Sequence, residues 1–342
     1  MILINVLVTG AGGGVGQGII KSLKMISDLD IKIIAADMSE KAAGLYAADA
    51  CYLVERCDSR SYMNTLERIF KKEAIDYYFP GTDVELAFCA ENKNFIKDAY
   101  GVHTVISSME TVSIADDKKK TAQFLKEQGF SYPQTIFADE VDFSAVSYPV
   151  IVKPAVGCRS IGVYKVNNER ELKERLSNPS GIVIQEHIGT DDSEYTCTVV
   201  KVDGDLSPVL VLKRILRSGD TFRAEPVRST VIENYVRAVA SKLDIDGGCN
   251  FQLRVDAEGV PKIFEINSRY SGTTPFCSQL GFNPIEFYLK KKEKLNYPFS
   301  VSYESVVLRF WSEVVISQPQ MKGLEQDKML VPQLDPQFHL FE

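Results

Sequence analysis

Histidine, paired cysteine and long apolar runs are all scarce in this chain of 342 residues. Its three histidines lie far apart, at positions 103, 187 and 339, so we expect no histidine-based zinc site. The seven cysteines are odd in number and show no CxxC spacing, which predicts reduced thiols and not a disulfide framework. No apolar run approaches the roughly 18 residues of a membrane span, and the N-terminal MILINVLVTG lacks the basic region of a signal peptide.

An excess of basic residues is also missing. The net charge is -7 and the isoelectric point about 5.3, values that argue against nucleic-acid binding. Together these absences predict a cytoplasmic protein that works on small molecules, away from membranes and nucleic acid. An anionic substrate must then be met by a local cluster of basic side chains. The sequence leaves the oligomeric state open, with a homodimer as one option.

What is present is an ordinary globular composition, with 45% hydrophobic residues and a length that suits two or three domains. Over the first hundred residues, apolar strands alternate with helices. Strands are expected at 6–10, 31–39, 76–83 with its loop, and 103–108, and helices at 17–26, 61–75 and 84–100. This alternation predicts an α/β domain with a parallel sheet and helical crossovers.

From Ser113 onward the pattern changes. A helix is expected over 113–130, with Ser113 as its cap and Gly129 as its stop. Hairpins follow, one turning near 203–205 and another between 256 and 261. The stretch from Gln318 is polar and is predicted to be irregular.

A glycine-rich turn follows the first strand, in VLVTGAGGGVGQGII, and Asp37 ends the second strand. This arrangement is typical of a dinucleotide-binding unit, so one hypothesis is an NAD(P)-dependent oxidoreductase. The same turn also suits close packing or a substrate pocket, for which Gly12, Gly13 and Asp37 are the candidates.

The hairpin FQLRVDAEGVPKIFEINSR carries the strongest chemical signal. Because alternate strand residues share a face, pairing would bring Gln252 beside Glu265 and Asn267, with Phe264 on the opposite face. Carboxylate and amide oxygens suit Mg²⁺ once phosphate oxygens complete the shell. Arg269, two residues further on, is placed to stabilise a transferring phosphoryl group. The alternative is an exposed polar face of an edge hairpin.

Upstream segments favour nucleotide binding over that alternative. Lys153 ends the apolar strand YPVIVKP and precedes a glycine-bearing loop over 157–162, where an ammonium and backbone N–H groups can reach phosphates. The next strand stops being apolar at 185–186, where backbone groups can meet a base edge. Glu194 is suited to accept from ribose hydroxyls.

Between the hairpins lies a local excess of positive charge, formed by Lys213, Arg214, Arg217, Arg223 and Arg228. One interpretation is that some of them meet a γ-phosphate or a substrate carboxylate. The other is a solvated loop. Cys158, inside the glycine loop, is interpreted as a small filler and not as a nucleophile.

In this order, from Lys118 in a helix through Lys153 to the final Q…ExNxR series, the motifs resemble the ATP-grasp superfamily. The closest likeness is to the synthetase halves of the carbamoyl phosphate synthase large subunit, over residues 1–300 and most clearly over 249–285. The resemblance implies an α/β fold: a Rossmann-like domain over 1–112, an ATP-grasp unit with subdomains 113–183 and 184–300, and a C-terminal extension over 301–342.

The resemblance also implies roles for single residues. ATP would be bound by Lys118, Lys153, Gly157, Ser160, Gly162, Gln185, Glu186, Ile188, Glu194 and Lys213. Mg²⁺, or Mn²⁺ in its place, would be bound by Gln252, Glu265 and Asn267, and Arg269, Lys153 and Arg214 would assist phosphoryl transfer.

The implied reaction joins a carboxylate to an amine through an acyl phosphate, with release of ADP and phosphate. With one synthetase unit, we expect a stand-alone ligase and not a carbamoyl phosphate synthase. An oxidoreductase that uses the glycine turn, a kinase-like variant and a non-catalytic nucleotide-binding protein are the alternatives.

Overall fold

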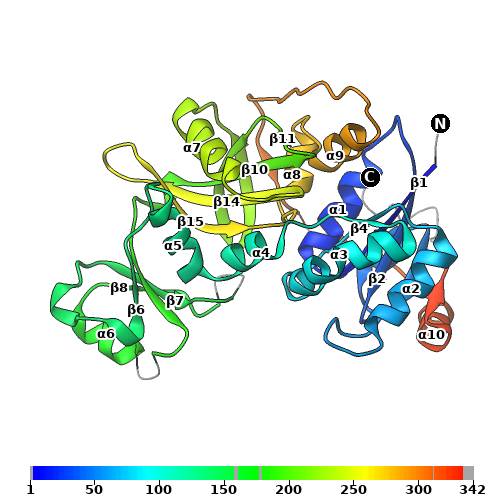
Figure 1. Cartoon of the computed structure of the whole chain (residues 1–342), viewed down its shortest axis with the longest axis horizontal. Helices are drawn as coiled ribbons and strands as arrows, with labels where there is room; N and C mark the ends of the chain where they lie inside the picture. The colour runs from blue at the N-terminus through cyan, green and yellow to red at the C-terminus, as the bar shows by residue number, and fades with distance from the viewer. Residues whose placement is uncertain (1–2, 158–160, 177–178, 311, 334–342) are drawn as a thin grey trace.

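The computed structural model describes residues 3–157, 161–176, 179–310 and 312–333, which form three sheets. A six-stranded sheet lies at one end of the molecule, a seven-stranded sheet in the middle and a four-stranded sheet at the other end (Figure 1). This confirms the predicted α/β class, with a parallel sheet first and a β-rich region after it. Within the described residues, no helix has the length and apolar character to cross a bilayer.

The N-terminal sheet is parallel except at one edge. Its strands are β1 (Leu3–Val8), β2 (Asp30–Asp37), β3 (Ala50–Leu53), β4 (Tyr77–Phe79) and β5 (His103–Thr104), in the spatial order β3-β2-β1-β4-β5. The connections are α1 (Gly14–Lys24), η1 (Ala43–Ala47), α2 (Tyr62–Glu73), η2 (Asp83–Glu85) and α3 (Leu86–Tyr100). Val6, Leu7 and Val8 are fully buried because helices cover both faces of the central strand, which is why β1 reads as a continuous apolar run.

The stretch from Gln318 corrects one prediction. It was expected to be irregular, but it forms α10 (Gln318–Asp327) and β17 (Met329–Leu330), which pairs antiparallel with β3 at the sheet edge. The only residue that α10 buries is Leu324, so its sequence carries little apolar periodicity. Tertiary packing, and not local pattern, determines this helix.

The glycine-rich turn after β1 is closely packed. A Cβ on Gly16 would lie 2.2 Å from the carbonyl oxygen of Gly10, so no larger residue fits there. The carboxylate of Asp37 accepts a hydrogen bond from the backbone N–H of Gly12 at 2.8 Å. The acid that a dinucleotide would use for its ribose is thus engaged by the turn itself, which supports the packing interpretation of these glycines.

The middle sheet is antiparallel. Its strands are β10 (Glu194–Val202), β11 (Asp205–Leu206), β12 (Leu210–Arg217), β13 (Asp220–Pro226), β14 (Gly247–Val255), β15 (Pro261–Asn267) and β16 (Val307–Leu308), in the order β15-β14-β10-β12-β13-β16 with β11 beside β10. One face packs on α7 (Thr230–Ser241) through a core that includes Phe251 and Val236. Part of the other face packs on α8 (Thr274–Gln279) and α9 (Pro284–Lys292). Both predicted hairpin turns are confirmed.

The helix predicted over 113–130 is two helices, α4 (Met109–Asp116) and α5 (Lys118–Glu127). Ser113 is not a cap: Ser108 caps α4, and the side chain of Asp117 caps α5 by accepting from the N–H of Lys119. Asp117 leaves helical geometry because it forms an isolated β-bridge with Val156. That break fixes where α5 begins, and therefore where its first side chain lies.

The four-stranded sheet forms a separate lobe (lower left in Figure 1). It contains β6 (Thr135–Phe137), β7 (Val150–Pro154), β8 (Tyr164–Val166) and β9 (Ile182–Glu186), in the order β6-β9-β7-β8, with α6 (Glu169–Arg175) packed against it. Short turns η3 (Ala138–Glu140) and η4 (Phe143–Ala145) complete this lobe, and η5 (Asp191–Ser193) leads from it into β10.

The glycine turn gives a first prediction. Gly16→Ala should lower the unfolding free energy by about 3 kcal/mol, because the new Cβ meets backbone atoms that cannot move aside. Gly14→Ala is the matched control in the same turn, since nothing lies within 4 Å of its Cβ position; alanine there should be neutral or slightly stabilising. Thermal unfolding of both variants checks this. Equal melting temperatures for the two would contradict the packing interpretation.

Candidate active site

A cavity of about 420 Å³ lies between the middle sheet and the four-stranded lobe. Its lining contains five cationic side chains, Lys118, Lys153, Lys165, Arg214 and Arg254, and three acidic ones, Glu186, Glu194 and Glu265. The cavity is therefore positive in a chain whose net charge is -7. Such a local excess suits an anionic ligand.

Ten of the predicted residues line this cavity: Lys118, Lys153, Gly157, Gln185, Glu186, Ile188, Glu194, Arg214, Gln252 and Glu265. They come from segments that are up to about half the chain apart, and the packing of two sheets brings them together. Asn267, Arg269, Gly162 and Lys213 are not among the lining residues. Ser160 and Cys158 lie outside the described residues.

Two lysines approach the cavity from different elements. Lys118 is the first residue of α5, and its Nζ donates to the carbonyl oxygen of Gly157 at 3.0 Å. Lys153 lies on β7, is 5% exposed, and donates from Nζ to Oε1 of Gln185 at 2.8 Å. Burial lowers the pKa of Lys153 to about 8, and Lys118 nearby adds to this, while Glu265 opposes it. Keeping Lys153 charged inside this cavity therefore costs the folded protein free energy.

The end of β9 forms one wall. The backbone N–H of Glu186 donates to the carbonyl oxygen of Gln134, and the Glu186 carboxylate accepts from the N–H of Gln134. Two hydrogen bonds therefore fix Glu186 against the segment that precedes β6. Gln185 donates from Nε2 to Thr135 while it accepts from Lys153. Apolar side chains from both sheets line the cavity around this edge: Ile151, Val163, Ile188, Leu216 and Phe264. A flat apolar group with a polar edge fits between them.

Phe264 corrects the predicted face of the hairpin. Gln252 pairs with Glu265, but Leu253 pairs with Ile263, so Phe264 is the extra residue of a β-bulge. The bulge places Phe264 and Glu265 together in the cavity lining, and the ring of Phe264 lies 5.3 Å from the Nζ of Lys153. Strict alternation along the strand could not predict this side chain.

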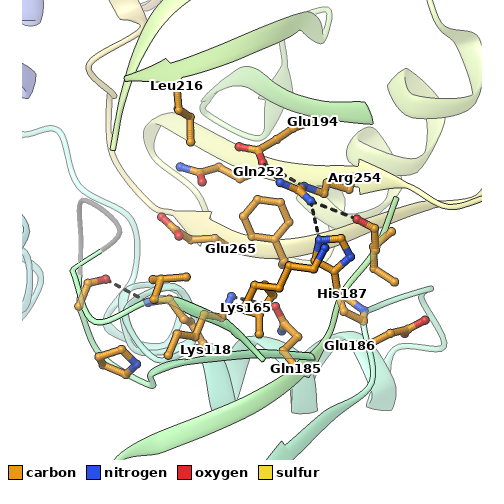
Figure 2. A pocket seen from close by; sticks show the side chains of 18 of the residues that line it. Lys118, Lys165, Gln185, Glu186, His187, Glu194, Leu216, Gln252, Arg254 and Glu265 are labelled. Carbon is orange, nitrogen blue, oxygen red and sulfur yellow. Dashed lines mark hydrogen bonds and ion pairs between the residues drawn. The ribbon is translucent and has the colours of Figure 1, made fainter. Parts of the chain in front are cut away.

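Glu194 forms ion pairs with two arginines, of which Figure 2 shows Arg254 beside it. Arg214 on β12 and Arg254 on β14 flank it, because β10 pairs with both of these strands. The Nη2–carboxylate distances are 2.7 Å for Arg214 and 2.8 Å for Arg254. Arg254 is not among the residues predicted for the site. Its place two residues after Gln252 in β14, on the same face, was the signal that could have found it.

Three oxygen-bearing side chains lie where the hairpin brings them together. Glu265 accepts at Oε1 from Nδ2 of Asn267 at 3.0 Å, and Gln252 accepts from Arg214 at 2.8 Å. Within the described residues, Oε2 of Glu265 has no hydrogen-bond partner, and no group of three His, Cys, Asp or Glu side chains forms a metal cluster. One carboxylate with two amides fits a cation that phosphate oxygens help to hold.

Arg269 lies behind this group and contacts the N-terminal domain. Its Nε and Nη2 donate to the two carboxylate oxygens of Asp83, at 2.6 and 2.9 Å, and Nη2 also donates to Asn267 at 3.1 Å. Asp83 begins η2, whose third residue, Glu85, is buried and accepts from Thr9, Tyr62, Tyr78 and the N–H groups of Gly81 and Thr82. Burial raises the pKa of Glu85.

The remaining basic residues do not join the site. Lys213 lies next to Arg214 on β12, and adjacent strand residues point to opposite faces, so it points away from the cavity. Arg217 and Arg228 lie over the rings of Phe222 and Tyr303. The segment 213–228 is not a loop, since most of it forms the paired strands β12 and β13. Arg217, Arg223 and Arg228 are exposed to solvent, and Arg214 lines the cavity.

Comparisons with known proteins agree with this geometry. Residues 115–273 match the family described as ATP-grasp domain, and residues 6–105 match the PylC-like N-terminal domain. The chain is 29% identical over 222 residues to the carbamoyl phosphate synthase large chain of Thermoanaerobacter sp. (strain X514), which covers 57% of this chain. It spans only 20% of the length of that relative.

Solved structures show the same fold. The L-amino acid ligase from Bacillus licheniformis superimposes with a TM-score of 0.65 at 19% identity, over 84% of this chain and 73% of that one. The N5-carboxyaminoimidazole synthetase from Staphylococcus aureus, complexed with ADP, gives 0.70 at 17% identity, over 90% and 82%. The biotin carboxylase from Campylobacter jejuni gives 0.66 at 20%, over 89% and 73%.

Lys153 gives a prediction for stability. Its folded pKa of about 8 lies below the ordinary 10.5, so the folded state carries the full cost of a buried charge below pH 8. Lys153→Met should therefore raise the unfolding free energy by about 2 kcal/mol at pH 7, after the lost bond to Gln185 is allowed for. This gain should shrink between pH 8 and 10.5, where the folded wild-type protein sheds the proton before the unfolded chain does.

Thermal unfolding at pH 7 and pH 10 measures this gain. Lys165→Met is the control, because Lys165 lines the same cavity but is exposed. A Lys153→Met protein that melts below the wild type at pH 7 would show that burial of this charge is not costly.

Proposed function

We propose, from the ATP-grasp domain at residues 115–273 and the PylC-like N-terminal domain before it, that this protein is an ATP- and Mg²⁺-dependent ligase that joins a carboxylate to an amine. The observation that carries the proposal is the convergence of Lys118, Lys153 and Glu265 on one positive cavity between two lobes. The carboxylate, the amine and the pathway stay unassigned.

The nucleotide is proposed to lie along the cavity. Its base fits between the apolar side chains near the end of β9, with Glu186 and Ile188 at its edge. Its phosphates lie towards Lys118, Lys153 and the loop that begins at Gly157, where two ammonium groups offset their charge. Solved structures of similar fold that hold ADP or its magnesium salt support the binding of a nucleotide by this chain.

Glu265, Gln252 and Asn267 would hold Mg²⁺ together with the phosphates. When bound, Mg²⁺ neutralises negative charge on the transferring phosphoryl group. Glu265 suits this task because its Oε2 has no hydrogen-bond partner in the described part of the chain. Mn²⁺ prefers the same oxygen ligands and is proposed as a substitute.

The reaction needs a carboxylate to become an acyl phosphate, which an amine then attacks. Arg214 lies in the cavity beside Gln252, and Arg269 lies behind Asn267, so both can stabilise negative charge at the reacting end. An acyl phosphate hydrolyses readily, so water must be excluded while the amine attacks. The four-stranded lobe covers the cavity on one side and is the part of the chain suited to exclude it.

Binding tests the nucleotide assignment first. Mg·ATP should raise the melting temperature of the full chain by mass action, whereas NAD⁺ and NADPH should not. Glu265→Gln should abolish ADP release with amino acids as trial substrates, a loss of at least about 100-fold, because the metal loses its carboxylate. Glu258→Gln, in the exposed turn of the same hairpin, should retain full activity. A dinucleotide shift without an ATP shift would refute the ligase proposal.

Substitution of Asp83 should change turnover, although Asp83 does not line the proposed nucleotide cavity. It positions Arg269 from the N-terminal domain through two hydrogen bonds, and Asp83→Asn keeps the shape but removes the charge. We expect kcat for ADP release to fall by about 10-fold or more, with the Kd of Mg·ATP within about threefold of the wild type. Asp83→Glu should recover part of the loss. Unchanged kcat in Asp83→Asn would make this pair a structural contact only.

A further inference from the structure

Arg309, which follows β16 directly, is a half-buried cation whose charge is not paired within the described part of the chain. The guanidinium makes one hydrogen bond to a described residue, from Nη2 to the carbonyl oxygen of Gly272, and its carbon lies 5.1 Å from the ring centre of Phe276. Burial lowers the pKa of Arg309, and the charge of Asp220 opposes this without forming an ion pair. A guanidinium has five N–H donors, and a charge removed from water without an anionic partner is costly.

A second cation, Lys21 of α1, lies near this guanidinium. Burial lowers the pKa of Lys21, and the charge of Arg309 lowers it further. Gly14 and Gly18 share the helix face of Lys21. A Cβ on Gly18 would lie 3.1 Å from Pro275, so this face is directed at the loop after β15. Helical side chains lean towards the N-terminus of their helix, so Lys21 leans towards Gly14.

Gly272 leaves room beside these cations. A Cβ on Gly272 would lie 3.8 Å from Nη2 and 4.0 Å from Nη1 of Arg309, and 4.0 Å from the carbonyl oxygen of Gly14, all ordinary contact distances. The first turn of α1, at Gly14, has no side-chain cap and no acidic residue. The N–H groups of a first helical turn lack intrahelical acceptors and favour negative charge. The two cations and this helix start therefore create positive potential around Gly272.

This group of charges is separate from the nucleotide cavity, because neither Arg309 nor Lys21 lines that cavity. Gly272 lies in the loop that begins directly after Asn267, the last residue of β15. The carboxylate that becomes an acyl phosphate must meet the γ-phosphate at the metal ligands. An anion held by Arg309 would therefore be a different group on one of the substrates.

We propose that Arg309, together with Lys21 and the first turn of α1, binds a second anionic group, a carboxylate or a phosphate, on one of the two substrates. The proposal rests on the proposed function, since it concerns the substrates of that reaction. An amino acid that reacts through its amine supplies this group with its own carboxylate, and a dicarboxylic acid supplies it with its second carboxylate. Arg309 suits either anion because its planar fork donates two parallel hydrogen bonds.

Melting temperatures of the full chain saturated with Mg·ADP test the proposal, because ADP keeps added anions out of the nucleotide cavity. The probes are the common L-amino acids against their amides, succinate against succinamate, and phosphoethanolamine against ethanolamine, at equal ionic strength. At least one anion should raise the melting temperature by about 2 °C more than its neutral or half-neutral counterpart, and the pair that responds identifies the source of the anionic group. A panel without such a pair overturns the proposal. The response to Mg·ATP, measured separately, still decides the ligase proposal.

Gly272→Asp supplies the counter-ion from within the chain. Its Cβ position meets no atom closer than 3.8 Å, and Arg309 lies within reach of the new carboxylate. The melting temperature without ligand should rise above that of the matched control Gly272→Ala, and the shift caused by the responding anion should disappear in the aspartate variant alone. An aspartate variant that melts below the alanine variant, or that still responds to the anion, contradicts the proposal.

Arg309→Met should also abolish the shift caused by the anion, with the Kd of Mg·ATP within about threefold of the wild type. Arg223→Met is the matched control on the adjacent strand β13, because Arg223 is exposed and is paired with Glu225; its response to the anion should equal that of the wild type. A shift that survives in folded Arg309→Met protein would show that the anion binds elsewhere.

Discussion

The antiparallel pairing of β12, β10, β14 and β15 is the constraint on which the site depends. Cross-strand register places Glu194 opposite Arg254 and Gln252 opposite Glu265, and the bulge after that pair turns Phe264 into the cavity. A shift of one residue in any of these strands would move its cavity side chains to the opposite face, into the core against α7. The register is held because the opposite face carries the apolar core, with Phe251, Leu253 and Ile266 fully buried or nearly so.

Buried charge distinguishes this cavity from an ordinary apolar cleft. The fold tolerates Lys153 and Glu194 at low exposure because each has partners: Gln185 for the lysine and two arginines for the glutamate. The two cases differ in their consequences. The lysine has a neutral partner, so its charge remains to attract an anion, whereas the glutamate is fully neutralised. A positive cavity results without any general excess of basic residues.

The N-terminal domain contributes to the site through one loop. The fully hydrogen-bonded Glu85 fixes the turn after β4, and that turn presents Asp83 to Arg269. A second contact, between His103 of β5, Asp246 and Tyr288, joins the same two domains away from the cavity. The position of the N-terminal domain therefore affects Asn267, one of the three proposed metal ligands, through Asp83 and Arg269.

The sequence by itself determined the α/β class, both hairpin turns and the pairing of Gln252 with Glu265, because local periodicity and turn residues suffice for these. It could not determine what depends on contact between distant segments. The bulge at Phe264, the helix break at Asp117 and the polar helix from Gln318 arise from pairing and packing that no local pattern records. The partners of Glu194 and Arg269 were decided by tertiary structure alone: a sequence shows that a charge is present, but only the fold shows which charge it meets.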